Sequence, residues 1–352
     1  MKRVLAAALV AGAFAALAAP VSRSTPADVV PVGEVVMGTL TSPPTPAFLA
    51  RVRTGQMGGV LLLGHWRSAK VIASTTAALQ HAACTAGGPL LIAADQEGGP
   101  VRRLPWAAPT VAPAEIATAA EAESQAASAA ASLARVGINV DLAPVADTPS
   151  SPRSFLGTRA FSPFPSVASG LVVSFVDGLQ QNGIAATAKH FPGLGYAGAN
   201  TDFRTVVVRA GLPALRRGLL PFQSAIDDGV QLVMVSNASY PALDPSGRPA
   251  VFSPRIVTGL LRTQLGFSGV IVSDTLTAPA ALRTPHAATR AIDAGVDLLL
   301  FGGDSASEQA YATLVADAAG SATLRARLVA SAQRIEALKQ WLAFAGNGPA
   351  CG

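Results

Sequence analysis

Short runs of continuously apolar residues recur along the chain, each about the length of one β-strand. They do not alternate between apolar and polar residues, which is typical of parallel strands that are covered on both faces. Eight such runs occur, at residues 34–40, 58–64, 89–95, 138–145, 183–191, 231–237, 269–274 and 297–303. The pattern therefore predicts a parallel sheet of eight strands.

Stretches with helical character separate most of these runs. Residues 120–137 and 214–229 are examples, and several such stretches end at a glycine, which accepts the left-handed conformation that closes a helix. Eight strand–helix units in about 300 residues predict a single-domain α/β protein, a (β/α)8 barrel of the TIM type. The alternative is an open doubly wound sheet, which is disfavoured because no G-x-G-x-x-G motif follows the first predicted strand.

The first residues have the pattern of a secretory signal. Lys2 and Arg3 precede an apolar run, and small residues follow that run. We predict a signal peptide at 1–18, a lead-in at 19–30, the barrel domain at 31–342 and a small-residue tail at 343–352. Cleavage would give a secreted, extracytoplasmic protein with no stable membrane span, and an uncleaved single-span anchor is the alternative.

The net charge and the positions of the histidines limit which ligands and partners the protein is expected to bind. The formal net charge is +5, and it falls to about +3 when Lys2 and Arg3 are removed with the signal. This bias suits an anionic cell-wall environment but is too weak to indicate nucleic-acid binding. The four histidines are scattered without ligand-like spacing, so we expect no metal site and no cofactor.

Two cysteines are present, Cys84 and Cys351. In an exported protein they can form a disulfide that ties the C-terminal tail to the body of the domain. The alternative is one buried thiol and one exposed thiol in the tail. We favour the disulfide.

Polar residues concentrate at the ends of the predicted strands. In a (β/α)8 barrel the carboxyl ends of all strands meet at one mouth, where active sites lie. Charged residues are 13% of the chain, so their concentration at apolar strand ends is informative. The residues at these positions are Asp95, Asp141, Asp147, Lys189, His190, Asn237 and Asp274.

Four segments together resemble glycoside hydrolase family 3, and specifically its single-domain bacterial β-N-acetylglucosaminidases that trim cell-wall muropeptides. The segments are DQEGGPVRRL (95–104), GINVDLAPVADT (137–148), AKHFPGLG (188–195) and residues 240–276, which end in GVIVSDTL. They occur in the order typical of the family. The resemblance implies a (β/α)8 barrel, in agreement with the strand pattern.

The resemblance also implies a retaining mechanism in two steps and assigns roles to individual residues. Asp274 matches the family's nucleophile, which attacks the anomeric carbon and forms a covalent glycosyl-enzyme. The residues that match sugar-binding positions are Asp95, Arg103, Arg159, Lys189 and His190. Asp141 and Asp147 would orient loops or cations from behind the site, and Asn237 would line the mouth. The expected substrate is a β-linked glycan that contains N-acetylglucosamine.

The loop after Lys189 and His190 departs from the family. In these β-N-acetylglucosaminidases, this loop carries a histidine soon after Pro-Gly and then an Asp-Ser-His sequence, whose histidine is the acid/base. Here the first position is Leu194, and Asn200-Thr201-Asp202 stands in place of Asp-Ser-His. Asp202 is therefore the candidate acid/base. A carboxyl group can act as an acid at working pH if burial or a nearby negative charge keeps its proton in place.

Three alternatives follow from this departure. The protein is a degenerate barrel that binds glycan without turnover, a β-glycosidase for another sugar, or a glycosidase that uses phosphate in place of water. The retained Asp274, Asp95, Arg103 and Arg159 and the Lys189–His190 pair favour an active hydrolase.

Overall fold

The computed structural model describes residues 30–348 and Cys351. In this part of the chain, eight parallel strands form one sheet in the order β10-β1-β2-β3-β6-β7-β8-β9. The strands are β1 (Val36–Leu40), β2 (Gly59–Leu62), β3 (Leu91–Ala94), β6 (Val140–Asp141), β7 (Ala185–Phe191), β8 (Leu232–Val235), β9 (Val270–Ser273) and β10 (Leu299–Leu300). All eight lie within the predicted apolar runs.

The sheet closes on itself between β9 and β10. Val272 and Leu298 form a parallel bridge there, and the Ser273 backbone N–H donates to the Leu298 carbonyl at 2.9 Å. The prediction of a (β/α)8 barrel is confirmed, and the open doubly wound sheet is excluded.

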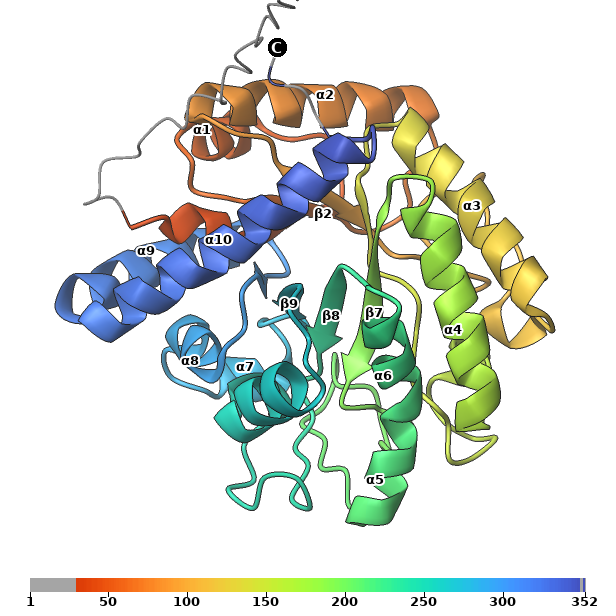
Figure 1. Cartoon of the computed structure of the whole chain (residues 1–352). Helices are drawn as coiled ribbons and strands as arrows, with labels where there is room; N and C mark the ends of the chain where they lie inside the picture. The colour runs from red at the N-terminus through yellow and green to blue at the C-terminus, as the bar shows by residue number, and fades with distance from the viewer. Residues whose placement is uncertain (1–29, 349–350, 352) are drawn as a thin grey trace, which may run out of the picture.

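Helices surround the barrel (Figure 1). Side-chain caps start several of them: the side chains of Thr45, Ser68, Thr118 and Ser321 each accept a hydrogen bond from a backbone N–H in the first turn. The helices are α1 (Pro46–Arg53), α2 (Ala69–Ala86), α3 (Ala119–Arg135), α4 (Pro165–Gln180), α5 (Leu212–Gly218), α6 (Leu220–Asp227), α7 (Pro279–Leu282), α8 (Ala287–Ala294), α9 (Asp304–Gly320) and α10 (Ala322–Phe344), with a π-helix at Arg255–Gln264.

Two features modify the regular strand–helix alternation. The helical stretch 214–229 is divided between α5 and α6, and Pro221, which has no N–H to donate, lies in the first turn of α6. A two-stranded antiparallel hairpin, β4 (Gln96–Gly98) and β5 (Val101–Arg102), directly follows β3. This hairpin folds back over the carboxyl end of the barrel, because the Arg103 N–H donates to the Asp95 carbonyl at 3.2 Å.

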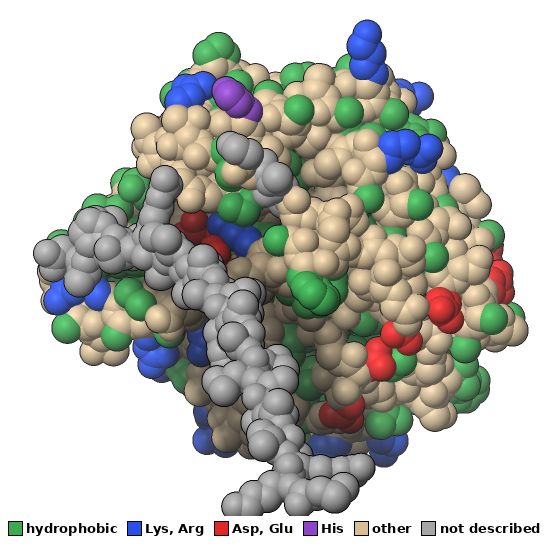
Figure 2. Space-filling model, turned by 45° about the horizontal axis from the view of Figure 1, so that its top comes forward, with side chains coloured by type: hydrophobic (Ala, Val, Ile, Leu, Met, Phe, Trp, Pro, Cys, Tyr) green, Lys and Arg blue, Asp and Glu red, His purple; other side chains and the backbone are tan. Residues whose placement is uncertain are grey.

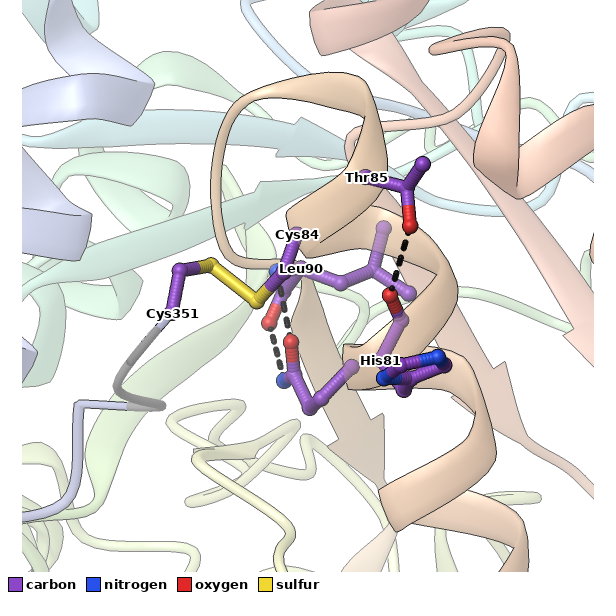
Figure 3. The surroundings of a disulfide bond; sticks show 6 residues. His81, Cys84, Thr85, Leu90 and Cys351 are labelled. Carbon is purple, nitrogen blue, oxygen red and sulfur yellow. Dashed lines mark hydrogen bonds between the residues drawn. A yellow bond between two sulfur atoms is a disulfide. The ribbon is translucent and has the colours of Figure 1, made fainter.

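The C-terminal tail crosses the amino end of the barrel. The Asn347 side chain donates to the Asn182 carbonyl, just before β7, at 2.9 Å. Cys351 then forms a disulfide with Cys84 of α2 (Figure 3), which confirms the predicted pairing. In Figure 1 α2, which carries Cys84, lies at one end of the barrel, whereas the arrowheads of β7 and β8 point to the opposite end.

The predicted signal peptide at 1–18 lies outside the described residues. None of the helices in the described part is both long enough and apolar enough to span a bilayer. On the face drawn in Figure 2, the described Lys and Arg side chains form small separate groups between neutral side chains.

Candidate active site

A cavity of about 350 Å³ opens at the carboxyl end of the barrel. Its lining comes from β-strands and loops that are far apart in the sequence. All seven candidate site residues line it: Asp95, Arg103, Arg159, Lys189, His190, Asp202 and Asp274. The fold therefore brings together every residue that the sequence nominated for catalysis or sugar binding.

Asp95 follows β3 and is paired with two cations. Its carboxylate accepts a hydrogen bond from Lys189 Nζ at 2.9 Å and from Arg103 Nη2 at 3.2 Å. Burial alone would raise the pKa of Asp95, but the charges of Lys189 and Arg103 outweigh it and lower that pKa to about 2. Asp95 is therefore ionised at any pH at which the protein would work.

Glu97 is a central member of the site that the sequence analysis did not single out. Its carboxylate accepts two hydrogen bonds from Arg159, both at 2.7 Å, and pairs with Lys189 at 2.7 Å. Although burial opposes ionisation, Lys189 and Arg159 lower the pKa of Glu97. The signal was present in the sequence, since residues two apart in extended chain face the same side, and Glu97 lies two residues after Asp95.

Lys189 thus pairs with both buried carboxylates, while Arg159 pairs with Glu97 and Arg103, which follows β5, pairs with Asp95. Only 2% of Lys189 and 1% of Glu97 is exposed. A pair of buried ions needs good geometry and extra hydrogen bonds to offset the loss of hydration. The bidentate Arg159–Glu97 contact and the double use of Lys189 provide both. The result is a rigid, ordered set of donors and acceptors on one wall of the cavity.

Asp147 orients His190, as the sequence analysis expected of a residue behind the site. His190 Nδ1 lies 2.8 Å from Asp147 Oδ2, and the backbone N–H of Leu194 donates to Asp147 Oδ1 at 2.6 Å. One carboxylate therefore fixes both the histidine ring and the start of the loop that follows it. Close packing constrains this loop further, since a Cβ at Gly195 would lie 1.8 Å from the Thr148 carbonyl oxygen.

Asp274 directly follows β9 and lines the same cavity as Asp95 and Lys189. Its Oδ1 accepts the Thr275 N–H at 2.7 Å, and its Oδ2 accepts the Thr201 hydroxyl at 3.4 Å. Burial raises the pKa of Asp274, the charge of His190 opposes that rise, and the charge of Asp202 adds to it. With two hydrogen bonds on a group that can accept four, its carboxylate retains free lone pairs.

The loop that replaces Asp-Ser-His runs across the rim of the cavity. Thr201 is buried and contacts Asp274, whereas Asp202 is exposed. Asn200 holds Asp202 at two points: its Oδ1 accepts the Asp202 N–H at 2.9 Å, and its Nδ2 donates to Asp202 Oδ2 at 3.2 Å. The carboxyl group of Asp202 is thus oriented by its neighbour.

Two other strand-end residues lie outside the cavity lining. Asn237 does not line the mouth, which corrects that expectation. Its side chain donates to the Thr275 carbonyl at 2.9 Å and so supports the backbone after Asp274. Asp141 is fully buried and accepts the Gln96 N–H at 3.0 Å, while its second oxygen has no partner among the described residues. Burial raises the pKa of Asp141 to about 8.

Comparison with known proteins gives consistent matches. The model of the family described as "Glycosyl hydrolase family 3 N terminal domain" matches residues 39–338. An "Uncharacterized secreted glycosyl hydrolase" of Arthroderma benhamiae is 36% identical over 270 residues, which cover 73% of this chain and 76% of that protein. A β-hexosaminidase of Nitrosomonas eutropha is 34% identical over 265 residues, which cover 70% of this chain and 74% of that protein.

Solved structures agree with the sequence matches. A glycoside hydrolase family 3 β-N-acetylglucosaminidase from a Paenibacillus species superimposes with a TM-score of 0.82 at 30% sequence identity. The match covers 89% of this chain and 62% of that one, so the chain spans less than two thirds of that protein's length.

Proposed function

The chain belongs to glycoside hydrolase family 3, and from this membership and the site we propose that it is a retaining β-N-acetylhexosaminidase. The observation that carries the proposal is the convergence of Asp274 with two cation-paired carboxylates, Asp95 and Glu97, on one cavity of about 350 Å³. A cavity of this size holds a single sugar ring. Carboxylates accept hydrogen bonds from sugar hydroxyls, and Lys and Arg side chains donate hydrogen bonds to them.

In the proposed reaction Asp274 is the nucleophile. Its carboxylate attacks the anomeric carbon as the bond to the leaving oxygen breaks, and a covalent glycosyl-enzyme forms. Thr275 and Thr201 hold the carboxylate by one hydrogen bond each and leave lone pairs for the attack. Water then releases the sugar and regenerates Asp274.

The remaining charged residues position the sugar. Asp95 and Glu97 accept hydrogen bonds from sugar hydroxyls, and Lys189, Arg103 and Arg159 keep both carboxylates ionised. His190 donates or accepts at Nε2, because Asp147 occupies its Nδ1. Fixed donors and acceptors of this kind orient the anomeric carbon toward Asp274 without reorganisation during the reaction.

Asp202 is the proposed acid/base in place of the family's histidine. It lines the same cavity as Asp274, and among Asn200, Thr201 and Asp202 it is the residue with an ionisable side chain. Asn200 orients its carboxyl group, as the aspartate of an Asp-Ser-His sequence would orient a histidine. Asp202 gives a proton to the leaving oxygen in the first step and takes one from water in the second.

We place the protein outside the cytoplasm, acting on cell-wall or other glycans that contain N-acetylglucosamine. The support is the signal-like sequence at 1–18, the disulfide, which persists in oxidising compartments, and the relative from A. benhamiae named as secreted. The β-hexosaminidase relatives support the sugar.

A panel of aryl β-glycosides tests the activity and the sugar together. We expect release of p-nitrophenol from the β-N-acetylglucosaminide to exceed release from the β-glucoside and the β-xyloside. Preference for another sugar would overturn the assigned specificity.

Asp202→Asn should lower kcat/KM about 100-fold or more for a substrate with a poor leaving group, and far less for an activated aryl glycoside, since only the former needs a proton. Equal losses would remove Asp202 as the acid.

One observation favours a second function, binding of glycan without turnover. Asp202 is exposed to solvent, and it stands at the place where the family's loop carries the acid/base histidine. Calorimetric binding of N-acetylglucosamine by the wild type, together with no turnover of any aryl glycoside in the panel, would establish this function instead.

A further inference from the structure

Phe203 is a large apolar side chain held in solvent directly beside the proposed acid. It is 78% exposed, and among the aromatic side chains of the described residues only Phe344, at the end of α10, is more exposed, at 94%. Exposed aromatic rings next to a polar cavity are typical of binding surfaces, because they offer a flat apolar face at a low cost in conformational entropy.

The segment that carries Phe203 is anchored on both sides. Before it, the buried Thr201 contacts Asp274. After it, Val206 and Val208 are buried, and the Val208 N–H donates to the Ser239 carbonyl at 2.8 Å. Because the residues around it are fixed, the ring is presented to solvent by the fold itself.

A second apolar side chain belongs to the same region of the rim. Arg283, which directly follows α7, donates to the Thr205 hydroxyl at 3.4 Å and so joins the end of α7 to this loop. Leu282, the last residue of α7, is 71% exposed. Phe203 and Leu282 are thus exposed just outside the cavity lining on two segments in contact, while the wall around Asp95 and Glu97 is charged.

The position of Phe203 identifies what it would contact. This step rests on the proposed function, in which Asp202 protonates the oxygen of the leaving group. The departing group must then lie beside residue 202, outside the charged wall that holds the first sugar. One face of a pyranose ring presents C–H groups, which pack well against an aromatic ring.

We propose that Phe203 forms the subsite for the leaving group and binds a saccharide ring there, so that a β-linked disaccharide binds more tightly than its single terminal sugar. The charged wall recognises the sugar that becomes attached to Asp274, and Phe203 recognises the sugar that departs. Recognition on the two sides of the broken bond is thus divided between polar and apolar contacts.

Binding to a protein that cannot turn over tests this subsite. In an Asp274→Asn background, Phe203→Ala should weaken N,N′-diacetylchitobiose binding about 5- to 10-fold in calorimetry and leave N-acetylglucosamine binding unchanged. Phe203→Trp should retain disaccharide affinity. Phe344→Ala, at a still more exposed phenylalanine at the amino end of the barrel, is the control and should change neither affinity. Unchanged disaccharide binding in Phe203→Ala, or equal weakening for both ligands, would overturn the proposal.

Kinetics separate this proposal from the proposed function. With wild-type Asp274, Phe203→Ala should lower kcat/KM for the disaccharide 5- to 10-fold and leave it unchanged for the corresponding β-glycosyl fluoride, whose leaving group has no ring. Absence of turnover in the wild type would contradict the enzymatic function alone, since the binding measurement still decides the role of Phe203.

Discussion

The two ends of the barrel each hold a buried aspartate on neighbouring strands, and the two aspartates are used in different ways. Asp297, at the amino end just before β10, accepts hydrogen bonds from Ser331 at 2.9 Å, Arg334 at 3.0 Å and the Ile271 N–H at 2.9 Å, and it pairs with Arg262. Asp274, at the carboxyl end after β9, accepts two hydrogen bonds from residues 30–348. Burial raises the pKa of both groups.

The contrast shows that burial and a raised pKa do not identify a reactive carboxylate. A carboxylate has about four lone-pair sites. At Asp297 all of them are filled by donors from β9, the π-helix and α10, so this residue holds the barrel to its outer helices. At Asp274 half remain free and face a cavity, which is what an attacking group requires.

The largest expected effect distinguishes these two aspartates, because replacing Asp274 should impair turnover and replacing Asp297 should impair stability. Asp274→Ala should lower kcat about ten-thousand-fold and leave the free energy of unfolding nearly unchanged. Asp297→Ala should lower the free energy of unfolding by about 3 kcal/mol or more, because it leaves Arg262 unpaired, while kcat of the folded protein stays normal. Urea unfolding and assays on a fully folded fraction measure both. Loss of turnover in folded Asp297→Ala would break the comparison.

A second test concerns the amino end alone. The Cys84–Cys351 disulfide spans 267 residues and restricts the unfolded chain. Replacing both cysteines by serine should lower the free energy of unfolding by about 2–4 kcal/mol. Because the bond lies at the end of the barrel away from the cavity, KM and kcat should not change at a temperature where the variant is folded. Thermal unfolding followed by circular dichroism, with and without reductant, gives the result; an altered KM would connect the tail to the site.

A third test compares two ion-paired glutamates, one at each end. Glu97→Gln removes a charge that Lys189 and Arg159 share, and it should lower kcat/KM about 10- to 100-fold. Glu34→Gln removes the partner of Lys339 at the amino end, where the contact is 2.6 Å, and it should leave kcat/KM unchanged. Initial rates on the aryl β-N-acetylglucosaminide give kcat/KM for both variants. Equal effects would mean that Glu97 is only a structural ion.

The smallest change between neighbouring measurements, at most about 1.4 kcal/mol per pH unit, is expected at Asp141, which accepts one hydrogen bond from the described residues. Its folded pKa of about 8 lies above the unfolded value near 4, so between these values the unfolded chain binds fewer protons. The wild type should therefore lose stability as the pH rises from about 4 to about 8.

Asp141→Asn removes this titration and keeps the acceptor for the Gln96 N–H. Its free energy of unfolding should depend less on pH over the same range, as measured by urea unfolding at several pH values. A wild-type stability that rises over this range at the same rate as that of Asp141→Asn would contradict a protonated Asp141.

The sequence predicted most of the fold because a strand buried on both faces must be apolar throughout. Each of the eight apolar runs contains a strand of the sheet, and the ring closes as the repeat of strand–helix units required. The division of 214–229 into two helices and the short hairpin after β3 were not predicted. Both depend on local backbone details that an apolar pattern does not encode.

The sequence also nominated seven site residues, and the structure brings all of them to one cavity. It did not use the position of Glu97 two residues after Asp95, and the contacts of this side chain with Lys189 and Arg159 were visible only in the structure. It also placed Asn237 at the mouth, whereas the side chain faces the backbone of Thr275.

The order of residues by itself determined the barrel, the position of carboxylates and cations at strand ends, and the substitution of Asn200-Thr201-Asp202 for Asp-Ser-His. These follow from periodicity and motif, which are local properties of the chain. Only the tertiary structure decided which carboxylates are saturated with hydrogen bonds, which share cations, and that Phe203 stands in solvent. Those properties depend on hydrogen-bond donors from segments that are distant in the sequence. The pattern of residues along the chain does not give the distances between such donors and their acceptors.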